Sequence, residues 1–276
     1  MLRSDKGFTV IEMFVALGIF AGIMVITTML LRQSVWVWTS TDSREDAGMV
    51  LSKARNALMR ELAQADLDPG DSGEPHFGLS QTPAALGGGD AVWFLSARGS
   101  SGEFSRDSDG YPYWQRNILF YLAKPQDHDA LFGMSCAPAS NPTGDEICPH
   151  KMLLRVVIDF PPATTPLPSP PAHPGPGDFP EDLISSVDIT NYLIAPQGQD
   201  VGAIQSQSGV EEVSIVATGL LWFKVQPAPG APDAGLQIDL RSVAVKEASK
   251  VSSVGSVSLF NSPQTLRNIF SIFPNN

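Results

Sequence analysis

The strongest constraint on this chain is an apolar segment near its N-terminus, residues 8–31, which contains a single formal charge, Glu12. As an α-helix these 24 residues would extend about 36 Å, which exceeds the roughly 30 Å hydrocarbon core of a bilayer. Residues 1–7 precede the segment and carry Arg3 and Lys6. Because positive charge holds a flanking segment in the cytoplasm, we predict one transmembrane helix with the rest of the chain on the far side.

Glu12 is a candidate functional residue because a carboxylate at membrane depth costs about 2.5–3.5 kcal/mol and needs a partner. If the chain were cut after Gly7, the new α-amine of Phe8 would lie four residues before Glu12. That cation could pair with Glu12 of the same chain or with Glu12 of a neighbouring copy. Since a pair within one chain gives no reason to assemble, we expect the pair between copies to guide docking.

The sequence G-F-T-V-I-E after a short basic leader resembles the signal of type IV prepilins and of the pseudopilins of type II secretion. The resemblance implies that a prepilin peptidase cuts between Gly7 and Phe8 and methylates the Phe8 amine, and that Glu12 directs assembly. It also implies a single-pass protein of the inner membrane with its C-terminal domain in the periplasm. The family's usual helix-bending proline is absent from residues 8–31. The alternative is a signal-anchored periplasmic binding or scaffold protein that does not polymerise.

The membrane helix is expected to continue through residues 32–67 as the spine of the periplasmic domain. Residues 39–43, T-S-T-D-S, could mark a bend or a break with a new N-cap. Beyond them, apolar residues at spacings of three and four define one helix face: Ala47, Val50, Leu51, Ala54, Leu58, Leu62 and Ala65. Core packing explains this face, and we expect the helix to end before the sequence D-P-G at 68–70.

Residues 68–276 are predicted to form a β domain. Residues 92–95 form a short apolar segment, and Ile118, Phe120 and Leu122 share one side of a second. Apolar and polar residues alternate in 152–160, 220–226 and 236–241, as in antiparallel sheets with one solvated face. Residues 68–90 are predicted as loop, and residues 161–180, with nine prolines, as an insertion into one domain. The expected fold class is therefore α+β, with a long N-terminal helix packed on an antiparallel sheet that carries long loop insertions.

The order of these strands extends the resemblance. N-I-L-F-Y-L-A, K-M-L-L-R-V-V-I-D-F, V-A-T-G-L-L-W-F-K-V-Q and G-L-Q-I-D-L-R-S-V-A-V-K-E follow the helix as strands do in J-type minor pseudopilins and W-type minor pilins. The resemblance is close over the first forty residues and loose beyond them. It implies other minor pilin or pseudopilin subunits, the prepilin peptidase and membrane lipid as partners.

Cys136 and Cys148 are the only cysteines, and we predict a disulfide worth about 3 kcal/mol between them. A zinc site is not expected, because the histidines fall in loop-like stretches without ligand spacing, although His150 is close to Cys148 in sequence: His76, His128, His150 and His173. No metal or cofactor is therefore predicted.

Enzymatic and nucleic-acid-binding functions are not expected. The net charge of −11 and the lack of any Lys/Arg run argue against a nucleic-acid partner. The run D-S-D-G, with Asp107 and Asp109, hints at a calcium loop, but Ile118 occupies the position where an EF-hand needs glutamate, and turn chemistry explains the run. No G-x-S-x-G or H-E-x-x-H motif occurs, so no catalytic residue is predicted.

Overall fold

The computed structural model describes residues 9–66, 76–99, 102–106, 110, 112–137, 144–159, 181–244 and 257–274. Within it, the chain separates into two units, Met1–Ser43 and Arg44–Asn276. The first unit contains the N-terminal part of the long helix, and the second contains the end of that helix together with the β-sheet.

The long helix, α1, runs from Val10 to Leu62. It passes through residues 39–43 without a break, so these residues do not provide a new N-cap. The hydroxyls of Thr39, Thr41 and Ser43 instead donate hydrogen bonds to backbone carbonyls one turn earlier. The helix ends five residues earlier than expected, because the amides of residues 64 and 65 bond three residues back, which tightens the last turn.

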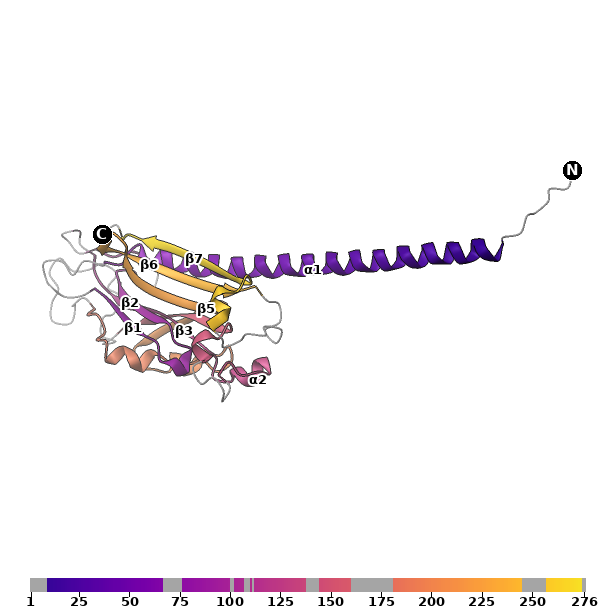
Figure 1. Cartoon of the computed structure of the whole chain (residues 1–276). Coiled ribbons are helices and arrows are strands. Elements are labelled where there is room, and N and C mark those ends of the chain that lie inside the picture. The colour runs from indigo at the N-terminus through magenta and orange to yellow at the C-terminus, as the bar shows by residue number, and fades with distance from the viewer. Residues whose placement is uncertain are drawn as a thin grey trace. The chain divides into compact units, whose positions relative to one another are not determined.

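The described residues contain seven strands in one sheet, in which every strand pairs antiparallel with the next along the chain (Figure 1). The strands are β1 (Phe77–Gln81), β2 (Asp90–Ser96), β3 (Arg116–Ala123), β4 (Lys151–Ile158), β5 (Val210–Ala228), β6 (Ala231–Val243) and β7 (Thr265–Ile272). Short helices lie in the connections: η1 (Ala84–Leu86), α2 (His128–Phe132), η2 (Gly144–Ile147), η3 (Asp188–Tyr192), α3 (Gly202–Gln205) and η5 (Val257–Asn261). The α+β class with a long N-terminal helix on an antiparallel sheet is confirmed, whereas likeness to pilins stays a prediction.

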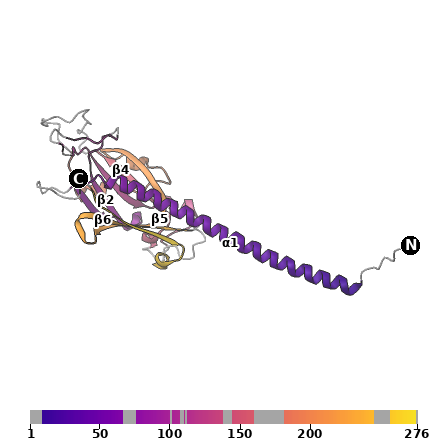
Figure 2. The same ribbon diagram turned by 90° about the horizontal axis from the view of Figure 1, so that it is seen from above.

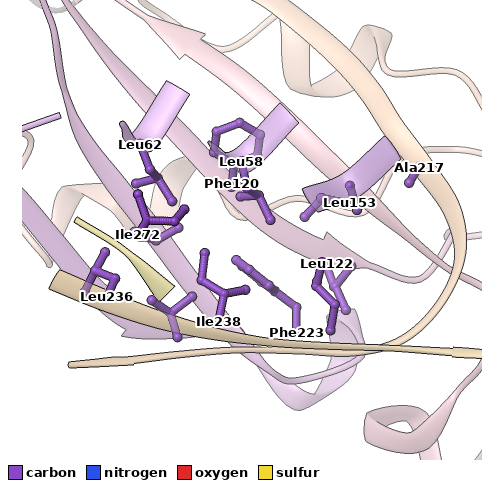
Figure 3. Packing of buried hydrophobic residues seen from close by; sticks show 14 of the residues in the cluster. Leu58, Leu62, Phe120, Leu122, Leu153, Ala217, Phe223, Leu236, Ile238 and Ile272 are labelled. Carbon is purple, nitrogen blue, oxygen red and sulfur yellow. The ribbon is translucent and has the colours of Figure 1, made fainter. Parts of the chain in front are cut away.

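The last part of α1 lies over one face of the sheet (Figure 2). Its buried apolar residues all belong to the predicted face, Ala47, Leu51, Ala54, Leu58 and Leu62; Val50 of that face is partly buried, and Ala65 follows just beyond the helix. In Figure 3, Leu58 and Leu62 point towards side chains from both halves of the sheet, among them Phe120 and Ile272. The helix thus completes the main hydrophobic core, because a sheet face needs an apolar layer to cover it.

The expectation of one solvated face is confirmed in β5, where buried Phe223 and Val225 alternate with exposed Lys224 and Gln226. Over β2, β3 and β4 it is wrong, because the face of the sheet opposite α1 is also covered. The segment 181–210 packs over it and brings η3 and α3 against β2, β3 and β4. Trp93 donates its indole N–H to the carbonyl of Ile184 at 2.8 Å, and the Tyr121 hydroxyl donates to the carbonyl of Ile194 at 2.8 Å. The alternation in β4 predicts that Lys151 lies on a solvated face, yet this side chain is fully buried.

Two strands were missed in the sequence analysis. β1 lies within the stretch expected to be loop, and its Gly78 packs so closely on the Trp93 ring that a Cβ there would overlap the indole. β7 pairs with β6, but Asn268 interrupts the apolar side of its alternation. Short or interrupted patterns of this kind give weak strand signals, and pairing with a neighbour decides them.

The proline-rich segment 161–180 lies outside the described residues. The strands on either side of it, β4 and β5, are neighbours in the sheet and pair along their length. The segment therefore connects two adjacent strands of one sheet.

Candidate functional site

The first candidate site is the N-terminal end of α1, where Glu12 lies in the first turn. Its carboxylate accepts hydrogen bonds from the backbone N–H and the hydroxyl of Thr9, both at 2.9 Å. In return, the Thr9 hydroxyl oxygen accepts the N–H of Glu12 at 3.3 Å. This is a capping box, which the spacing T-x-x-E could have revealed from the sequence. The predicted cleavage and methylation positions, Gly7 and Phe8, lie outside the described residues.

The first unit exposes its apolar side chains on all sides of α1. An 18-residue window of this helix has a mean hydropathy of 2.5, and none of it is buried by the protein. Length and composition therefore allow this helix to cross a membrane. Trp36 and Trp38 follow and are also exposed, which suits either the lipid–water boundary or packing between subunits.

The second candidate site lies in the connection between β3 and β4. The predicted disulfide between Cys136 and Cys148 is present, and both cysteines are fully buried. Cys136 follows α2, and Cys148 follows η2 just before β4 begins. Gly144 in η2 lies so close to the Cys136 carbonyl oxygen that a Cβ would overlap it, so a glycine is required there.

Two histidines converge on this disulfide, so the expectation that the cysteines lack suitably placed histidines is wrong. The cysteine–histidine cluster consists of His128, Cys136, Cys148 and His150, all buried, and its possible ligand atoms lie within 4.8 Å of one another. His128 Nε2 is 2.8 Å from His150 Nδ1. The same His128 nitrogen is 3.5 Å from one sulfur and 3.3 Å from the other. Nitrogen and sulfur ligands in this number suit a zinc ion.

Hydrogen bonds and burial set the ionisation of the cluster. The Asp129 carboxylate accepts a hydrogen bond from His128 Nδ1 at 2.8 Å, and this bond lowers the pKa of Asp129 despite the opposing effect of burial. Burial, and to a lesser degree the neighbouring His128, lowers the pKa of His150 to about 4. The His150 ring is therefore neutral at neutral pH. Its Nε2 atom has no hydrogen-bond partner among the described residues.

Lys151 is the first residue of β4, directly after the cluster, and its side chain bonds to the segments around η1 and η2. Its ammonium group donates to the carbonyls of Gly87 at 2.7 Å and Glu146 at 2.8 Å. Burial lowers the pKa of Lys151 to about 7, against the opposing charges of Glu146 and Asp145. Two carbonyl acceptors and full burial make this lysine a structural tie between η1, η2 and β4.

Two further polar contacts join loops elsewhere in the second unit. Asp66 pairs with His76 at 3.1 Å. Asp127 accepts the backbone N–H of Gly198 at 2.5 Å, which joins two loops. Asp107 and Asp109, the weak calcium candidates, lie outside the described residues, as does His173.

Comparison of the chain with protein-family models, with curated proteins and with solved structures finds no match.

Proposed function

We propose that this chain is a minor pilin-like or pseudopilin-like subunit, processed and N-methylated by a prepilin peptidase, that assembles with sister subunits into a filament for protein export or pilus initiation. It acts as a structural subunit of the inner membrane with its sheet domain in the periplasm, and it carries out no reaction of its own. The observation that carries the proposal is the first part of α1, which is apolar on every side, unburied by its own chain, and headed by one carboxylate.

The exposed apolar helix supports assembly because it requires an apolar environment. Exposing apolar surface to water costs about 25 cal/mol per Å², so lipid or the helices of sister subunits must cover this surface. A subunit stored in the membrane and then packed among similar helices exchanges one apolar environment for another. Small differences in free energy between these two environments, such as that from one ion pair, can then decide whether the subunit assembles.

Glu12 supplies that difference. Thr9 gives its carboxylate two hydrogen bonds within the chain, but both donors are neutral and leave the negative charge uncompensated. A cation from a neighbouring subunit is therefore attracted strongly in a medium of low dielectric constant. The α-amine created at Phe8 is the cation that the prepilin signal implies.

Mass spectrometry of the mature N-terminus tests processing. The expected product begins with a methylated Phe8, and Gly7→Glu should leave the precursor uncut because the peptidase needs a small residue there. A wild-type protein that retains Met1 would contradict the proposal and favour a signal-anchored protein that does not polymerise.

Two substitutions at Glu12 separate the charge from the helix cap. Glu12→Gln keeps an acceptor for Thr9 and loses the charge, whereas Glu12→Ala loses both. With a photoreactive residue at position 19, we expect both variants to insert and be cleaved yet to lose cross-links to sister subunits. Thr9→Val, the matched control, weakens the cap and keeps the charge, so it should still cross-link.

The opposite results are equally informative. If Glu12→Gln cross-links like wild type while Glu12→Ala fails, Glu12 serves the cap and the charge mechanism is wrong. If both variants cross-link like wild type, Glu12 has no part in docking.

A further inference from the structure

We propose that the cysteine–histidine cluster is a closed zinc site in the reduced form of the chain. The disulfide and the zinc complex are then two alternative cross-links at one place in the fold. The inference does not rest on the assembly proposal, because it concerns the unassembled chain.

The positions of the ligand atoms support this assignment. In a tetrahedral zinc site, bond lengths of about 2.0–2.3 Å place neighbouring nitrogen atoms about 3.3 Å apart and nitrogen–sulfur pairs about 3.6 Å apart. In the cluster, the two nitrogens are 2.8 Å apart, and the four nitrogen–sulfur distances are 3.5, 4.0, 3.3 and 3.8 Å. Shifts of about half an ångström, together with separation of the two sulfurs after reduction, would bring the four atoms to tetrahedral positions.

The surroundings of His128 provide a second, independent indication. A carboxylate can only accept, so the short contact with Asp129 requires the proton of His128 to be on Nδ1. In the neutral ring this leaves Nε2 unprotonated, 2.8 Å from His150 Nδ1 and 3.3 and 3.5 Å from the two sulfurs. A carboxylate that orients a ligating histidine in this way is the usual outer partner of protein zinc sites.

The cluster is also held in place from outside. The Phe132 ring stacks on His150 with centroids 4.1 Å apart and planes 9° apart, and it also contacts His128. The four side chains are buried, so no position is open to solvent. A closed set of two thiolates and two imidazoles corresponds to a structural rather than a catalytic zinc site.

The conversion between the two states is balanced. A dithiol reductant gives two electrons and two protons to the Cys136–Cys148 bond and itself becomes a disulfide. The two thiols then release two protons as their sulfurs bind Zn²⁺, while the two neutral imidazoles bind through their lone pairs. Zinc therefore replaces the lost covalent link between α2 and the start of β4.

The test uses the full-length chain in detergent, reduced with a phosphine, which becomes the phosphine oxide, and kept free of oxygen. Co²⁺ serves as the spectroscopic probe, and Zn²⁺ is titrated against a coloured chelator. We expect one ion per reduced chain, thiolate-to-cobalt charge-transfer absorption, tetrahedral visible bands, and a higher unfolding midpoint with Zn²⁺. The oxidised chain should bind neither ion at this place.

Variants identify the ligands without removing the cysteines. His128→Gln and His150→Gln should each weaken zinc binding more than about tenfold and alter the cobalt spectrum, and Asp129→Asn should weaken it roughly ten- to a hundredfold. His76→Gln is the matched control, because His76 pairs with Asp66 elsewhere, and it should leave binding unchanged.

Two results would overturn the proposal. The first is a reduced wild-type chain, folded or unfolded, that takes up no stoichiometric Zn²⁺ and shows no thiolate-to-cobalt band. The second is binding of wild-type strength in either His128→Gln or His150→Gln. In that case the histidines contact each other only through a hydrogen bond beside the disulfide.

Discussion

Between Val10 and Ser43, α1 exposes apolar side chains all around its axis, whereas between Arg44 and Leu62 it buries one face and exposes the other. The backbone hydrogen bonding is the same in both parts, so helix formation does not distinguish them. What differs is the covering: the sheet packs on the second part, whereas none of the apolar 18-residue window in the first part is buried by the described chain. One continuous helix can therefore belong to two different environments.

The hydroxyl-rich turn at 39–43 joins these parts. The hydroxyls of Thr39, Thr41 and Ser43 donate hydrogen bonds to carbonyls of the preceding turn. A polar segment can thus continue an apolar helix into water without ending it. The predictions below test the contrast between the two parts, beginning with the largest expected effect.

The most direct test replaces one leucine in each part. Leu58 is 0% exposed and Leu17 is 56% exposed. Leu58→Ala should lower the free energy of unfolding of the sheet domain by about 4 kcal/mol, because it leaves a cavity in a packed core. Leu17→Ala should leave that domain unchanged. Urea unfolding of the full chain in detergent, followed by tryptophan fluorescence, measures both.

Met59 provides a control within the second part, since it is adjacent to Leu58 and is 37% exposed. Met59→Ala should cost less than about 1 kcal/mol. Equal losses for Leu58→Ala and Met59→Ala would mean that α1 does not present one buried face to the sheet.

Reduction of the disulfide should affect the second unit alone. With a chelator present to exclude metal, loss of the Cys136–Cys148 link should lower the unfolding free energy of the domain by about 3 kcal/mol, because the unfolded chain regains the entropy of a short loop. Before reduction, both cysteines should resist alkylation. A Cys136→Ser/Cys148→Ser variant should show no change on addition of reductant, and membrane insertion should be unaffected throughout.

Acid should weaken an ion cluster at the C-terminal end of the sheet. Asp239 is partly buried, which raises its pKa, but hydrogen bonds from Arg267 and Arg241 outweigh burial and hold the pKa below its ordinary value. Its contribution is therefore present above the unfolded pKa of about 3.9 and is lost as pH falls through the lower folded value.

We expect this contribution to be about 1 kcal/mol, because Arg267 is half exposed. Unfolding free energies of wild type and Asp239→Asn, compared at neutral pH and in acid, measure it. The difference between the two proteins should shrink in acid; a constant difference would show that the charge of Asp239 contributes nothing.

The smallest expected effect is in the hydroxyl-rich turn at 39–43, where the two parts of α1 join. Thr41→Ala removes a hydroxyl that bonds to a carbonyl at 3.0 Å, but alanine has the higher helix propensity. Helicity in detergent, measured by circular dichroism, should stay the same or rise slightly, with a change of about 0.5 kcal/mol or less. A clear loss of helicity would mean that the hydroxyl bonds hold the two parts of α1 together.

Much of the fold could be predicted because the spacing of apolar residues along the sequence indicates helices and strands locally. The apolar face from Ala47 to Ala65, the exposed apolar segment and the central strands all follow from spacing. β1 and β7 could not be predicted in this way, since Gly78 and Asn268 interrupt their patterns and only pairing with a neighbour completes them. At the N-terminal site, the spacing of Thr9 and Glu12 is enough to predict the capping box.

The sequence by itself determined that this chain has an apolar helix able to cross a membrane, a single carboxylate near its start, and an antiparallel β domain, because each depends on composition and local spacing. Only the tertiary structure decided that both faces of β2, β3 and β4 are covered, that Lys151 is buried, and that His128 and His150 meet the disulfide. The two histidines are 22 residues apart, one at the start of the five-residue helix α2 and one just before β4, so no periodicity relates them. Their meeting depends on β3 and β4 pairing side by side, which brings the two ends of their connection together.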